Sequence, residues 1–167
     1  YKEAVKEGLK PIIGVEAYLT PGSRFERRPV KEEPNHHLLL LAEDETGYRN
    51  LMKLVTLSYM EGYYYKPRMD KEILREYGKG IIALSACVKG ELASYLLADD
   101  YEGAKRAAAE YLSIFGDGNF YLEIIDHSLP EEKKVNPGLV QIGKELGIGL
   151  AASNDLHYVR RDDHIDH

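Results

Sequence analysis

Residues 149–158, GLAASNDLHY, join a short apolar run to two side chains of metal-binding type. The small and apolar residues up to Ser153 are typical of a buried strand. Asp155 and His157 follow at positions i and i+2, and in extended backbone such residues point the same way. The two side chains can therefore bind a zinc-like or manganese-like cation, act as acid and base, or form a structural ion pair.

Other apolar runs of the chain carry similar side chains in or after them: Glu16 in IIGVEAYL, Cys87 at the end of IIALSAC, and Asp126 with His127 after FYLEII. The apolar neighbours of Glu16 predict burial on both faces, and a buried carboxylate needs a cation or hydrogen-bond donors. Cys87 has two interpretations. It is either an inert small hydrophobe or a thiolate ligand at a strand end.

The run LLLLA at residues 38–42 is typical of a strand that is covered on both faces, as in parallel sheets. Two histidines precede it, and His37 is a candidate ligand at its entrance. Glu43 and Asp44 lie at its exit and are rivals by position. The residues alone leave this choice open.

Helical segments separate the apolar runs, and Pro137 is expected to break or restart the one near residues 130–146. Alternating strands and helices predict parallel strands with helical crossovers, so sites should gather at the carboxyl ends of the strands. No Gly-x-Gly-x-x-Gly follows a strand and no P-loop is present. The fold class is therefore α/β, and part of a (β/α) barrel is favoured over a nucleotide-binding unit.

The composition is that of one globular domain of 167 residues, with 44% hydrophobic and 30% charged residues. A net charge of −6 argues against broad electrostatic adhesion to nucleic acid, so contacts with DNA should be local. The single cysteine excludes an intrachain disulfide and is compatible with a reducing cytoplasm. No apolar run is long enough to predict a membrane span.

Two segments are expected to be loops. Residues 20–34 are rich in proline and charge and show no period. The segment YYYKPR at residues 63–68 combines tyrosines, which can stack on bases, with cations, which can hold phosphates. Alternatively the tyrosines pack at the edge of a loop. His164 and His167 are expected on the surface of a further helix.

Six ordered blocks extend through nearly the whole chain: GVEAYLTPGSRF, HLLLLAEDETGYRNLMKL, GYYYKPRMD, GIIALSACVKGE, FYLEIIDHSLP and SNDLHY. Together they resemble the PHP (polymerase and histidinol phosphatase) domain of bacterial C-family replicative DNA polymerases. The resemblance implies a distorted (β/α)7 barrel. Residues 1–167 would form a truncated PHP domain, because the family's opening His-x-His and Thr-Asp-His-Gly motifs would lie upstream and the polymerase palm downstream.

The resemblance also implies up to three divalent transition metal ions, of which zinc and manganese are the main candidates. The resemblance favours His37 over Glu43 as a metal ligand. It also implies that Asp155 and His157 take part in catalysis by holding the metal. The implied metal ligands are Glu16, His37, Cys87, Asp155 and His157. Arg68 and His127 are expected to contact phosphate, from their position and charge.

Three functions follow as hypotheses. In the first, the parent is a cytoplasmic DNA-directed DNA polymerase of DNA replication. Its PHP domain removes nucleotides from DNA 3′ ends by metal-dependent 3′–5′ exonuclease hydrolysis, beside the remaining polymerase domains and other replicase subunits. In the second, the domain is a non-catalytic scaffold that contacts a separate proofreading subunit. The third is a free-standing phosphoesterase, against which the blocks GYRNLMKL and GYYYKPR argue.

Overall fold

The computed structural model describes residues 1–27 and 34–165. The predicted position of His167 and residues 28–33 of the predicted loop lie outside the described residues. In the described part, one mixed sheet contains the strands β1 (Gly14–Leu19), β2 (His36–Ala42), β3 (Arg68–Met69), β4 (Ile81–Leu84), β5 (Phe120–Ile125) and β6 (Gly149–Ser153). Their order across the sheet is β3-β1-β2-β4-β5-β6.

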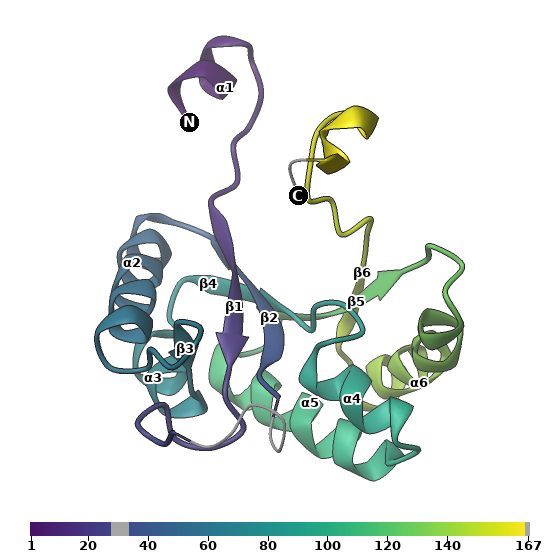
Figure 1. Cartoon of the computed structure of the whole chain (residues 1–167). Helices are drawn as coiled ribbons and strands as arrows, with labels where there is room; N and C mark the ends of the chain where they lie inside the picture. Colours follow the sequence, from purple (N-terminus) through teal and green to yellow (C-terminus); the bar gives the residue numbers. More distant parts are fainter. Residues whose placement is uncertain (28–33, 166–167) are drawn as a thin grey trace.

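The helices are α1 (Lys2–Lys6), α2 (Glu45–Met60), α3 (Lys71–Tyr77), α4 (Glu91–Leu97), α5 (Tyr101–Phe115) and α6 (Pro130–Leu146), with a 3-10 helix η1 at Arg161–Ile165. Figure 1 shows α1 and η1 standing away from the sheet, at the end of the molecule opposite α4 and α5. The prediction that Pro137 interrupts the last long helix is wrong, because α6 continues through it. No helix in the described ranges has the length and hydropathy needed to cross a membrane.

The sheet is mixed rather than parallel, which corrects the predicted strand directions. β2 is antiparallel to both β1 and β4, whereas β1–β3, β4–β5 and β5–β6 are parallel pairs. The described strands form an open sheet, so the α/β class is confirmed while the barrel stays a prediction. The reversal of β2 has a direct consequence, since its first residues lie beside the carboxyl ends of β1 and β4.

The two faces of the sheet differ in what covers them. Leu38 and Leu40 are buried in the core, whereas Leu39 between them is only half-buried. The run LLLLA therefore alternates between faces, and the prediction that the strand is covered on both is wrong. The core lies between one face and the packed helices. The opposite face carries Glu16 and His37, and we call it the pocket face.

Candidate metal site

Three side chains of metal-binding type converge on the pocket face. Glu16 Oε1 lies 2.5 Å from His37 Nδ1, and Cys87 Sγ lies 3.8 Å from the same nitrogen. The three ligand atoms all lie within 4.8 Å of one another. Glu16 comes from β1, His37 from β2 and Cys87 from the loop after β4, so the site joins three neighbouring strands.

The loop after β4 fixes the position of His37. The backbone N–H of His37 donates to the carbonyl of Lys89 at 3.0 Å, and Gly90 N–H donates to the carbonyl of Cys87 at 2.8 Å. A Cβ on Gly90 would lie 2.2 Å from the carbonyl oxygen of Ser85, so only glycine fits here. The same turn therefore places both the thiol and the imidazole.

Two strand ends that face this site carry a non-glycine residue with positive φ. Ala86 has φ 62° and Asp155 has φ 46°, and both are non-glycine residues in left-handed conformations. Such conformations cost about 1–3 kcal/mol each and persist where the surrounding structure enforces them. The fold thus holds the residue before Cys87, and Asp155 itself, in costly geometry at the pocket.

An open pocket lies beside the three converging side chains and brings the end of β6 to them. Asp155 and His157 line it together with Glu16 and Cys87. The carbonyl oxygen of Asp155 lies 2.8 Å from His157 Nδ1. A carbonyl can only accept, so Nδ1 carries the proton and the neutral ring has its lone pair on Nε2.

The prediction that Glu16 is buried is wrong, and the structure shows why. Its side chain is 38% exposed, and Ile12 and Ile13, two of the apolar neighbours behind the prediction, precede β1 and are themselves exposed. Glu16 and Leu39 are register partners and share the pocket face. The carboxylate therefore faces the pocket instead of the core.

Glu123 is a pocket residue that the sequence analysis did not identify. It lies in the middle of β5, is 5% exposed, and accepts a hydrogen bond from the hydroxyl of Ser153. Burial raises the pKa of Glu123, and the charges of Asp155 and Glu16 add to this effect. A single carboxylate inside the apolar run FYLEII was the available signal.

The electrostatics of the pocket favour an added cation. Burial raises the pKa of the Cys87 thiol, and Asp155 and Glu16 raise it further through their charge. A thiolate next to these carboxylates is therefore disfavoured unless positive charge is supplied. A bound divalent cation would favour the thiolate and both carboxylates together.

The donor set also suits a transition metal by its geometry. Carboxylate, imidazole and thiolate are the ligand types of zinc sites. Bonds of about 2.0 Å to nitrogen and 2.3 Å to sulfur place two tetrahedral ligands roughly 3.5 Å apart, close to the 3.8 Å between His37 Nδ1 and Cys87 Sγ. Glu16 Oε1 would have to move away from Nδ1, because 2.5 Å is a hydrogen-bond distance.

His127 lies beside the pocket and ties two strand ends together. Its Nδ1 lies 3.0 Å from Glu132 Oε1, and its Nε2 lies 3.0 Å from the carbonyl oxygen of Asn154. The bond to Asn154 raises the pKa of His127 most, and the bond to Glu132 raises it further. The ring thus joins the end of β5 to the residue before Asp155.

Arg68 has a different environment from the one expected of a phosphate ligand. It is 5% exposed and lies in β3, and its guanidinium donates to the carbonyls of Gly62, Arg24 and Glu26 at 2.8–2.9 Å. This part of the predicted loop forms a short strand instead. Arg68 holds neighbouring backbone in place and does not line the pocket.

The remaining polar residues that were weighed from the sequence lie in local turns. Asp44 accepts a hydrogen bond from Gly47 N–H and caps α2, and Glu43 is exposed. Asp126 accepts from Ser128 N–H at 2.9 Å. His164 is exposed in η1, as expected.

Comparison with known proteins defines the class of this protein. Residues 1–127, which make up most of the chain, match the PHP domain family. The chain therefore belongs to that family.

The chain is also similar to named bacterial proteins over nearly its whole length. It is 49% identical to DNA polymerase III subunit alpha of Thermus aquaticus over 98% of the chain. It is 44% identical to that subunit of Aquifex aeolicus and 46% identical to that of Deinococcus radiodurans, each over 100% of the chain. The chain spans 13–15% of the length of these relatives.

Proposed function

We propose that this chain is the PHP domain of a bacterial replicative DNA polymerase, and that it hydrolyses phosphodiester bonds at DNA 3′ ends. One observation carries the proposal: Glu16, His37 and Cys87 converge beside a pocket that Asp155 and His157 also line. The names of the relatives, each a DNA polymerase III subunit alpha, support the polymerase context.

The residues have separate tasks in this proposal. Glu16, His37 and Cys87 would hold one divalent transition metal ion, zinc or manganese, and Asp155 with His157 would hold a further ion. Such ions lower the pKa of a bound water and neutralise charge on the phosphate. Up to three ions would bind in the intact domain, the third with ligands from outside this chain.

The other residues of the pocket position these ligands. Glu123 holds the hydroxyl of Ser153 at the end of β6, and His127 holds the carbonyl of Asn154. Both contacts act on the backbone that leads into Asp155. They hold in place the two residues before Asp155, which itself has a left-handed φ of 46°.

A structural role is the second candidate, and one observation favours it. The hydrogen bond between His37 and Glu16 is complete without an ion, so these side chains can form a polar network that only stabilises the sheet. In that case the domain serves as a scaffold for the polymerase and for a separate proofreading subunit.

Metal content and 3′-end trimming of the full-length natural protein separate the two roles. Asp155→Asn keeps the size of the side chain but weakens a ligand, so we expect loss of bound metal and a fall of roughly 100-fold in trimming rate. Asp117→Asn, in an exposed loop, is the matched control and should change neither. Polymerase activity should persist in both variants.

Two results would contradict hydrolysis. Trimming that is unchanged in Asp155→Asn would assign the activity to another nuclease. Absence of metal from the natural protein, with polymerase activity and melting temperature falling together in Asp155→Asn, would favour the scaffold.

A further inference from the structure

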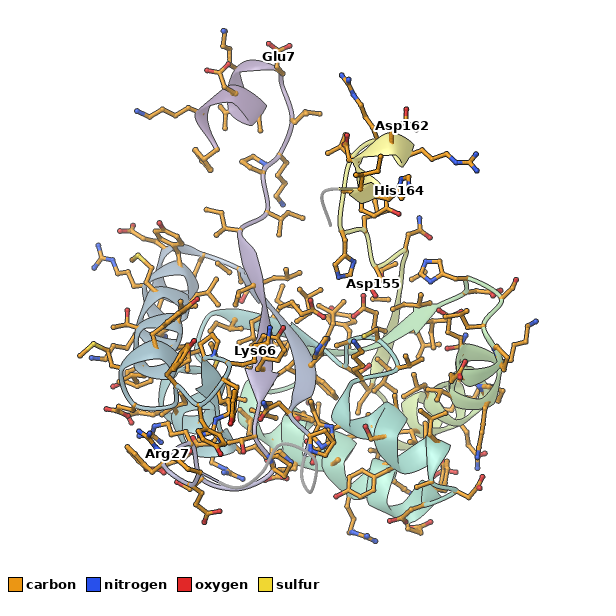
Figure 2. All side chains as sticks on the ribbon, viewed as in Figure 1. Glu7, Arg27, Lys66, Asp155, Asp162 and His164 are labelled. Carbon is orange, nitrogen blue, oxygen red and sulfur yellow. The ribbon has the colours of Figure 1, made fainter. Side chains whose placement is uncertain are left out.

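A lysine outside the pocket is held close to the candidate metal site. Tyr18 pairs with His37 across β1 and β2, and the two rings make an edge contact with centroids 5.3 Å apart. Lys66 Nζ lies 5.3 Å from the centroid of the Tyr18 ring. Figure 2 shows Lys66 lying over β1. A chain of contacts therefore runs from Lys66 through Tyr18 to His37.

A strained turn gives Lys66 this position. Tyr64 N–H donates to the carbonyl of Lys66 at 3.1 Å, which closes a tight turn with Tyr65 at its tip. Tyr65 has φ 60°, a left-handed conformation that a bulky side chain rarely adopts. Residues in such sparsely populated conformations cluster at active sites and ligand clamps. Here the turn directs Lys66 back over Tyr18.

The charge of Lys66 is not matched within the described residues. Arg24 pairs with Asp70, and Lys71 pairs with Glu91 and Glu110, but Lys66 forms no ion pair with any residue in the described ranges. Its side chain is exposed, so the ammonium keeps access to a ligand. The face of the Tyr18 ring attracts the ammonium and limits its motion without neutralising it.

We propose that Lys66 binds a backbone phosphate of the DNA strand whose 3′ end enters the pocket. This inference rests on the proposed function and assigns it a substrate-positioning residue. Glu16, Glu123 and Asp155 line the pocket, so a phosphate of the strand that lies beyond the proposed metal ions meets carboxylates instead of cations. A cation held over Tyr18, which lies two residues along β1 from Glu16 and on the same face of the strand, would bind such a phosphate and fix the strand. This is the task expected of Arg68 from the sequence. Lys66 is two residues away and, unlike Arg68, exposed.

The first test reads Lys66 itself and needs no hydrolysis. The full-length natural protein is acetylated with and without an oligothymidylate that carries hydrolysis-resistant phosphorothioate linkages, and each lysine is followed by mass spectrometry. We expect the oligonucleotide to slow acetylation of Lys66 at least about tenfold, since a charge-assisted contact contributes roughly that factor. Lys53, exposed on α2, is the internal control and should react at an unchanged rate. Equal protection of both lysines, or of neither, would overturn the proposal.

The second test uses kinetics. Lys66→Met should raise the KM for 3′-end trimming about tenfold with kcat nearly unchanged, and Lys66→Arg should restore it. The slope of log kcat/KM against log salt should become shallower by about 0.7, the value for one phosphate contact on a single strand. An unchanged KM in Lys66→Met would refute the role of Lys66 while leaving hydrolysis intact. Protection of Lys66 in a protein that lacks trimming would instead refute the hydrolysis and keep the DNA contact.

Discussion

Two charged clusters in this protein differ in charge balance. The arginine cluster consists of Arg24, Arg68 and Asp70. Arg24 donates to both Asp70 and Glu61, and Asp70 also accepts from the backbone N–H of Ile73. The donors and acceptors of this cluster satisfy one another. Burial lowers the pKa of Arg24, but the bonds to these carboxylates outweigh that effect and raise the pKa overall.

The pocket cluster, in contrast, is short of positive charge. Glu16, Glu123 and Asp155 all face the pocket, and the imidazole of His37 is the partner of Glu16. Burial raises the pKa of Glu123, the charges of Asp155 and Glu16 add to this effect, and the hydrogen bond from Ser153 offsets it only in part. Charge balance, rather than burial of charge, therefore distinguishes a structural cluster from one that needs a ligand.

The largest effect is expected in the arginine cluster. Asp70→Asn removes a 3% exposed carboxylate and leaves the buried Arg24 with the more exposed carboxylates of Glu61 and Glu72, which should cost about 3–5 kcal/mol of stability. Glu72→Gln is the matched control, because the Glu72 side chain is 72% exposed and should contribute less than about 1 kcal/mol. Urea denaturation measures both values. Metal bound per folded molecule should stay unchanged, and a loss of metal in Asp70→Asn would show that the two clusters are coupled.

A smaller effect is expected for Glu123→Gln, which should stabilise the metal-free protein where Asp70→Asn destabilises it. Because the pKa of Glu123 is raised above its ordinary value of 4.5, ionisation of this group at neutral pH costs stability in the metal-free protein. Glutamine removes that cost, so the chelator-treated variant should be more stable than the natural protein at pH 7, by about 1 kcal/mol. The difference should shrink as the pH falls through the raised pKa of Glu123 and disappear below about 4.5, its ordinary value.

When metal is bound, Glu123→Gln should instead be less stable than the natural protein. Glu123→Gln removes negative charge and a support of β6, so metal affinity should fall by about 10–100-fold. Glu102→Gln, exposed on α5, is the control for charge alone. Thermal melts with chelator test the expected gain in stability of the metal-free variant, and melts without chelator test its expected loss of metal affinity. A variant less stable than the natural protein in chelator would mean that the pocket cluster is balanced without metal.

The sequence was sufficient to locate most strands but not to give their directions. Apolar runs and turn residues are local signals, and β1, β2, β4, β5 and β6 lie close to where these predicted them. Direction depends on the partner strand, which is distant in the sequence. The reversal of β2 brings His37, rather than Glu43, beside Glu16 and Cys87. The residues alone left that choice open, and the family resemblance favoured His37.

Site residues were predictable to the extent that they follow a strand. Cys87, Asp155 and His157 do so, and all three line the pocket. Glu123 lies inside a strand, where only the register shows that it shares the pocket face. Arg68 is the last residue of the loop-like segment YYYKPR, yet its contacts with distant carbonyls bury it. Long-range contacts, which no local pattern contains, decided both cases.

The smallest effect is expected at His127, between the pocket and its supporting strands. The pKa of His127 is raised by the carbonyl of Asn154 and by Glu132, so the protonated ring stabilises the fold. This contribution is complete below about pH 6.5 and is lost as the pH rises through the raised pKa. The natural protein should therefore exceed His127→Gln in Tm by at most about 2 °C at pH 6, and the difference should disappear at alkaline pH.

Titration of the His127 ring protons by NMR checks the cause directly. The midpoint should lie above 6.5, and Glu132→Gln should lower it, because the carboxylate of Glu132 is 3.0 Å from Nδ1. A midpoint at or below 6.5 would mean that the ring is neutral at physiological pH. Nε2 could then not donate to Asn154 while Nδ1 donates to Glu132, so one of the two bonds would be absent. The strand end that carries Asp155 would in that case be held by Glu123 and Ser153 without His127.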